Sequence, residues 1–132
     1  MERKRRGTVP YVEPSTRLLP NGCVLTVLEG VIDDAALLSS AKHALPHIAA
    51  HRSPWVLDIS QAQLRASLRT PLTELAIEIK KHHGAGVVAV ILSQMHRTTL
   101  STICLKHGVT FRFAATQADA ITDALELQKL LI

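Results

Sequence analysis

The chain has 132 residues, of which 47% are hydrophobic and 3% aromatic, and a formal net charge of +4. This length suits one domain with one core, because a chain of this size buries roughly two thirds of its unfolded surface. The low aromatic content leaves no stacking platform for bases, which argues against nucleic-acid binding. No apolar run reaches the ~18 to 20 residues of a membrane span, so we expect a cytoplasmic protein.

The N-terminus concentrates positive charge. Residues 3–6 read Arg-Lys-Arg-Arg, and Pro10 and Pro14 follow shortly afterwards. Such a block is typical of a solvated tail, so the net charge says little about partners. We predict a flexible basic arm over residues 1–10 and a single α/β domain over residues 11–132.

The first expected elements form a hairpin and a helix. Pro20-Asn21-Gly22 separates two apolar runs and supplies the backbone angles of a tight turn, which predicts an antiparallel pair. Gly30 is expected to end the second strand. Asp33 or Asp34 then offers an N-terminal cap for a helix that begins near Ala35.

This first helix has an apolar stripe, and its opposite face carries His43, His47 and His51. Histidines four residues apart on a helix can bind a transition metal, but no carboxylate or thiolate accompanies them. We therefore interpret them as a solvated polar face. Pro46 lies on the same outer face and is expected to bend or break the last turns of the helix.

Three further apolar runs, 55–59, 87–92 and 109–113, are separated by helical segments. Strands that alternate with helices require crossover connections and therefore a mostly parallel sheet. The predicted fold class is α/β, with a mixed, mostly parallel sheet of about five strands, an N-terminal antiparallel hairpin and four main helices.

The helices between and after these strands have recognisable ends. Residues 60–69 are expected to form a polar loop, after which Thr70 caps a helix with Pro71 in its first turn. Residues 80–83 (Lys-Lys-His-His) are expected to complement the helix dipole at the C-terminal end of this helix, and Gly84 is expected to terminate the helix. An anion-binding site at residues 80–83 is the alternative interpretation.

The next helix, 94–106, is expected to bury only Leu100, Ile103 and Cys104, and to lie at the margin of the sheet. Thr116 and Asp119 then predict a capping box at the start of the last helix. The expected inner side of that helix consists of Ile121, Ala124, Leu125 and Gln128. Both cysteines, Cys23 and Cys104, are expected to be buried free thiols.

No catalytic or cofactor motif is present. Asp58 comes near the end of a central strand, where α/β sheets place ligands, and Ser60 follows it. However, Gly84-Ala85-Gly86 precedes a strand and therefore cannot place a phosphate at a helix N-terminus. No serine lies in a nucleophile elbow. We expect neither enzymatic activity nor a cofactor.

Four segments of the chain, residues 24–30, 33–34, 56–60 and 113–120, share a pattern with a known family. They resemble the STAS family, the domains shared by sulfate transporters and anti-sigma factor antagonists, and the similarity extends over residues 17–131. The resemblance implies a domain that binds a partner protein and is switched by phosphorylation of a serine in an Asp-Ser-Ser-Gly type motif. Ser67 falls on that position, but the acid before it and the glycine after it are absent. Our hypothesis is that Ser67 is not a phosphoacceptor and that partner binding is constitutive.

The resulting functional expectation is a regulatory protein-interaction module. The expected partner surface covers residues 60–72 and 94–99, with candidate contact residues Ser60, Arg65, Ser67, Arg69, Gln94 and His96. The alternative is a carrier of a small apolar ligand or lipid, because STAS-like domains are related in fold to lipid-carrying Sec14-type domains.

Overall fold

A computed structural model describes residues 15–64, 69–90 and 93–130. Its five strands and four helices alternate after an initial strand pair. In chain order they are β1 (Ser15–Leu18), β2 (Val24–Ile32), α1 (Asp34–His51), β3 (Trp55–Leu64), α2 (Arg69–Lys81), β4 (Val87–Val90), α3 (Gln94–His107), β5 (Phe111–Ala114) and α4 (Gln117–Lys129). The predicted arm over residues 1–10 and residues 91–92 of the predicted third apolar run lie outside the described residues.

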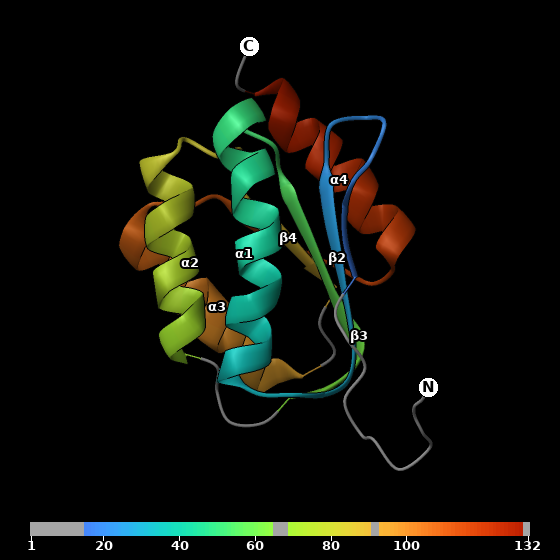
Figure 1. Ribbon diagram of the computed structural model, residues 1–132, viewed down its shortest axis with the longest axis vertical. Helices are drawn as coiled ribbons and strands as arrows, with labels where there is room; N and C mark the ends of the chain where they lie inside the picture. The colour runs from blue at the N-terminus through green and yellow to red at the C-terminus, as the bar shows by residue number, and fades with distance from the viewer. Residues whose placement is uncertain (1–14, 65–68, 91–92, 131–132) are drawn as a thin grey trace, which may run out of the picture.

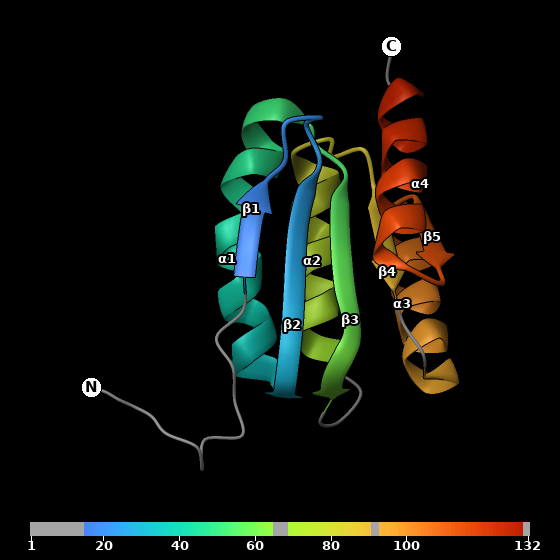
Figure 2. The same ribbon diagram turned by 90° about the vertical axis from the view of Figure 1, so that its right-hand side faces the viewer.

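The five strands form one sheet in the order β1-β2-β3-β4-β5. Only β1 and β2 are antiparallel, and the other neighbouring pairs are parallel. Figure 1 and Figure 2 show α1 and α2 side by side on one face of the sheet and α4 on the other face. The predicted fold class is therefore confirmed.

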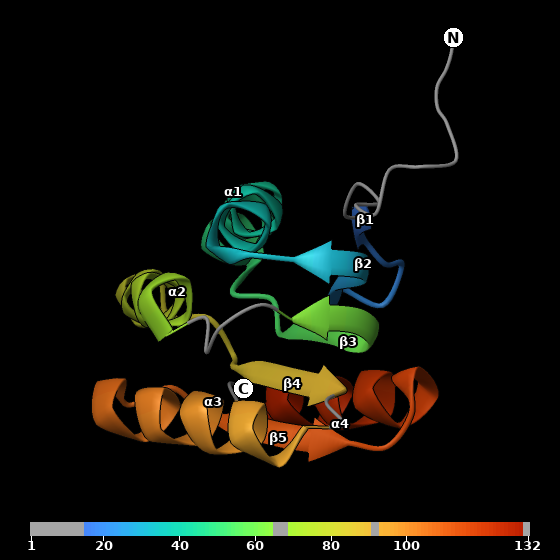
Figure 3. The same ribbon diagram turned by 90° about the horizontal axis from the view of Figure 1, so that it is seen from below.

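Two apolar layers hold the helices to the sheet. The larger layer lies under α1, α2 and α3, and the smaller one lies under α4. Strand β3 contributes to both, because successive side chains of a strand point to opposite faces. Trp55 and Leu57 belong to the larger layer, and Val56 belongs to the smaller one. Viewed from below in Figure 3, the helices flank the stacked strands accordingly.

Trp55 brings a hydrogen bond into the larger layer. Its side chain is fully buried, and its Nε1–H donates to Thr26 Oγ1 of β2 at 2.9 Å. The Thr26 hydroxyl is also 2.9 Å from Thr16 Oγ1 of β1. This chain of polar contacts links the first three strands through otherwise apolar surroundings.

Strand β2 is longer than the sequence pattern indicated. Gly30 does not end it, because the strand continues to Ile32 with Gly30 at a φ of +79°. Glycine adopts such a left-handed conformation without steric cost, so the chain bends there while its pairing continues. Gly22, at a φ of +94°, supplies the positive angle of the predicted hairpin turn.

Helix α1 begins at Asp34, one residue before the expected start, and Asp33 is the one of the two candidate residues that caps it. The Asp33 carboxylate accepts the Ala36 N–H at 2.9 Å. The expected break at Pro46 is wrong, since the helix runs through Pro46 to His51. Pro46 is exposed, while buried Ala44 and Ile48 on either side pack into the core and hold the turns together.

Helix α2 begins at Arg69, so Thr70 is already inside the helix and is not its cap. Its end also differs from the prediction. His83, not a glycine, takes the left-handed conformation, at a φ of +57°, and the Gly84 N–H donates to Ile79 O at 2.9 Å. Gly84 serves close packing instead, because a Cβ there would lie 2.8 Å from Ile48 Cγ2.

The last two helices bury somewhat different faces from those expected. In α3, His96 and Thr99 are buried beside the three predicted residues. In α4, Thr116 caps the helix by accepting the Asp119 N–H, as predicted, but the fully buried positions are Ala120, Ala124 and Leu127. The small side chains of the two alanines allow α4 to lie close to the sheet. The buried face of α4 is therefore shifted by about one residue from the predicted face.

Two other predictions concern the cysteines and the membrane. Both cysteines are buried free thiols, as expected. Burial raises the pKa of the Cys104 thiol to about 11 and also raises the pKa of Cys23, because the charged thiolate is disfavoured there. Among the described helices, none is both long and apolar enough to span a bilayer.

Candidate partner-binding edge

The carboxyl ends of the parallel strands and the N-termini of the helices lie at one edge of the sheet. Helices α1 and α2 both begin at the lower end of the molecule in Figure 1, where β2 and β3 terminate. This is the edge at which open α/β sheets bind ligands and partners. We call it the carboxyl edge.

A β-bulge shapes the middle of this edge. Val27 of β2 pairs with Asp58 of β3, whereas Glu29 pairs with Gln61, so Ile59 and Ser60 together lie opposite the single residue Leu28. The extra residue disrupts the ladder and leaves a backbone N–H in need of another partner. The expected loop over residues 60–69 is therefore wrong in its first half, since β3 continues through the bulge to Leu64.

Asp58 supplies that partner. Its Oδ1 accepts the Ser60 N–H at 3.0 Å and the Ser60 hydroxyl at 2.7 Å. Its Oδ2 accepts the side-chain amide of Gln117, at the start of α4, at 2.9 Å. Asp58 is only 8% exposed, so three donors satisfy a nearly buried carboxylate. Its evident role is to hold the bulge in place and to anchor α4 to β3.

This arrangement limits the chemistry at Asp58 and Ser60. The Ser60 hydroxyl donates to a carboxylate two residues away, and the other oxygen of that carboxylate accepts from Gln117. A nucleophilic serine needs an adjacent base that is itself oriented by a third group. Here the carboxylate is committed to structural hydrogen bonds.

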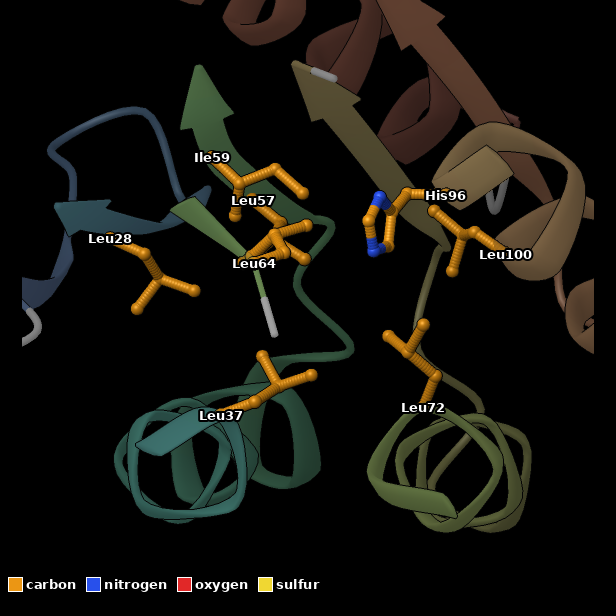
Figure 4. A pocket seen from close by; sticks show the side chains of 8 residues that line it. All are labelled: Leu28, Leu37, Leu57, Ile59, Leu64, Leu72, His96 and Leu100. Atoms are coloured by element: carbon orange, nitrogen blue, oxygen red, sulfur yellow. The ribbon is translucent and has the colours of Figure 1, made fainter. Parts of the chain in front are cut away.

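A small apolar cavity lies behind the edge. Figure 4 shows eight side chains from the sheet and from α1, α2 and α3 that converge on it. They are Leu28, Leu37, Leu57, Ile59, Leu64, Leu72, His96 and Leu100. The space open to the centre of a water-sized sphere is only about 10 Å³, close to the ~10–15 Å³ that one water molecule needs. In this conformation the cavity has no room for a lipid chain.

The predicted contact residues differ in their exposure to solvent. Arg69 and Gln94 are the first residues of α2 and α3, and both are exposed. Ser60, in β3, is partly buried. His96 does not belong to the surface, because it is only 7% exposed and points into the apolar cavity. Arg65 and Ser67 lie outside the described residues.

No protein-family model matches the sequence, and no curated protein matches it.

Met95 and Arg97 fall within the expected surface over residues 94–99, but the sequence did not single them out, and it gave no sign of the contact made by Gln117. Met95, the second residue of α3, is 54% exposed and is an apolar side chain at the rim. Arg97 lies over the Phe113 ring, 4.9 Å from its centroid, and so ties the first turns of α3 to β5. Gln117 is separated from Asp58 by 59 positions, so no local pattern predicts their contact.

The histidines of α1 remain a solvated face, as expected. His43 and His51 are exposed, and His47 is partly exposed. Across the described part of the chain, no group of three or more histidine, cysteine or acidic side chains is arranged to hold a metal ion.

Proposed function

We propose that this chain is a non-catalytic, STAS-like regulatory module that binds a partner protein at its carboxyl edge. The contact surface is formed by the first turns of α2 and α3, and these two helices pack against each other. We define this partner surface by Arg69, Thr70, Gln94 and Met95, all of which are exposed.

The observation that carries the proposal is the electrostatic character of these two helix starts. Neither α2 nor α3 has an acidic residue in its first turn, and Ser93 makes no side-chain cap. A helix N-terminus carries roughly half a positive charge, and neither first turn contains an acidic side chain that would offset it. Arg69 is a basic residue at the start of α2, and Met95 adds exposed apolar area. Together these features suit an acidic partner surface with an apolar contact point.

The hydrogen bonds of Asp58 support a role without catalysis. Its three hydrogen bonds to Ser60 and Gln117 give this carboxylate a structural task. The mixed sheet and the order of helices are compatible with the STAS resemblance, which supplies the regulatory part of the proposal. We keep the hypothesis that Ser67 is not a phosphoacceptor and that partner binding is constitutive.

A carrier of a small apolar ligand is the second candidate. The apolar cavity at His96 favours it, but the available volume of about 10 Å³ opposes it. A bound acyl chain would require α1, α2 or α3 to move away from the sheet. For this reason we place partner binding first.

Two matched variants of α3 test the proposal. Met95 and Leu105 are both exposed apolar residues, at 54% and 72%, but they lie near opposite ends of the helix. We expect Met95→Asp to weaken capture of the partner from the native cells at least tenfold, because it adds a negative charge and removes the apolar contact. Leu105→Asp should leave capture unchanged.

The readout is quantitative mass spectrometry of proteins that copurify with the wild type and each variant. Thermal melting of each variant shows that both remain folded. Equal capture by Met95→Asp and the wild type would contradict the proposed surface, and so would equal losses from the two variants.

A further inference from the structure

The opposite edge of the sheet contains a polar pocket among the loops that follow α1, α2 and α3. Its lining includes Arg52, Lys80, His83, Gly84, Gly108 and Thr110. The volume in which the centre of a water molecule can lie is about 200 Å³, whereas a single water molecule needs ~10–15 Å³. The pocket therefore has room for a group of several heavy atoms.

The topology explains why cations gather here. Helices α1, α2 and α3 return antiparallel to the strands, so all three end at this edge, which we call the amino edge. Each helix carries basic residues in its last turn, namely His51, Lys80, Lys81, Lys106 and His107. Among the described residues that line the pocket, none is acidic.

Two cations of the lining keep donors available. Arg52 Nε donates to His83 O at 3.3 Å, and Lys80 Nζ donates to Gly108 O at 3.5 Å. A guanidinium has five N–H donors and an ammonium has three, so each group can bind a ligand while it retains its contact with the backbone. Both contacts also hold the two charges at the pocket.

The charge balance at the pocket is positive. The C-terminal end of each helix contributes roughly −0.5 charge, which gives about −1.5 for the three helices. Arg52 and Lys80 contribute two full positive charges from the lining itself. Lys81 and Lys106, in the last turns of α2 and α3, add to the potential around it. The basic residues at this edge therefore carry more positive charge than the helix dipoles need, so the predicted role of residues 80–83 in complementing a dipole explains only part of it.

We propose that the amino-edge pocket binds a compact multivalent oxyanion of the phosphate class. Arg52 and Lys80 are the binding residues, and they donate charge-assisted hydrogen bonds from two sides of the pocket. This site lies at the edge opposite the partner surface, so it does not depend on the proposed partner binding.

Lys80 and Lys81 provide a matched pair for the test. Both are exposed lysines at the end of α2, but only Lys80 lines the pocket. Inorganic phosphate and pyrophosphate are titrated separately at constant ionic strength, and the backbone amide signals of Gly84, Gly108 and Thr110 are followed by NMR. We expect saturable shifts at these amides, with pyrophosphate bound more tightly than phosphate.

Lys80→Gln should weaken binding about tenfold, and Lys81→Gln should change it less than twofold. Thermal melting verifies that both variants remain folded. An absence of saturable shifts at the pocket amides would overturn the site. Equal weakening by the two variants would also overturn it, because that result indicates a diffuse basic surface.

Discussion

Asp58 shows how a residue in the position of a catalytic group can have a structural task. It lies in the central part of β3, where its place in the chain suggested chemistry, but the bulge after it leaves the Ser60 N–H without a ladder partner. The carboxylate satisfies this donor and also the Gln117 amide. Asp58 therefore helps to hold the bulge and the start of α4 in place at the carboxyl edge.

Substitutions at Asp58 test this role. Asp58→Ala should lower the free energy of unfolding by about 1.5–3 kcal/mol, because it removes charged hydrogen bonds and leaves a buried N–H unsatisfied. Asp58→Asn should cost less than half as much, since its carbonyl oxygen can still accept from Ser60 and Gln117 can turn its own oxygen toward the new amide. Urea unfolding curves measure both values. An Asp58→Ala protein as stable as the wild type would show that the bulge does not depend on this side chain.

The sequence predicted individual residues well where the interaction is local. The Asp33 and Thr116 caps were found because each contact spans three residues. His96 was misplaced because its position near a helix start suggested exposure, whereas the packing of α3 turns it into the apolar cavity. Such long-range contacts leave no periodic signal in the chain.

At the scale of the elements, α2 gave the clearest pattern, although both its first residue and its end differ from the prediction. Its apolar spacing of three and four residues matches the buried face of Pro71, Leu72, Leu75, Ala76 and Ile79. The boundaries of β2 and β3 were harder to predict, because polar residues 61 and 63 in a strand resemble a loop when one face is exposed. The continuity of α1 through Pro46 depends on tertiary packing, which the local propensity of proline does not reveal.

A pair of substitutions in α2 tests its buried face. Leu75 is 4% exposed and Ile77, two residues later, is 46% exposed. Leu75→Asp should unfold the protein, because burying a carboxylate costs several kcal/mol against a total stability of roughly 5–15 kcal/mol. Ile77→Asp should change the free energy of unfolding by no more than about 0.5 kcal/mol. Circular dichroism melting curves distinguish the two outcomes, and a folded Leu75→Asp variant would mean that this face is assigned incorrectly.

At the scale of the whole molecule, the fold separates two surfaces. Because the parallel strands share one direction, helix starts collect at the carboxyl edge and helix ends collect at the amino edge. The strand and helix order that implies this arrangement was predictable from the sequence. The cavity sizes at the two edges were not, because they depend on how side chains from several distant elements fill the space between them.

We propose that the carboxyl edge binds a protein and that the adjacent apolar cavity does not carry a ligand. Native mass spectrometry of the chain purified from its native cells tests both parts in one measurement. The expected spectrum contains the mass of the chain together with a complex whose added mass is that of a protein. A stoichiometric adduct of lipid size that is lost on denaturation, with no protein complex, would contradict protein binding at the carboxyl edge and support the carrier function.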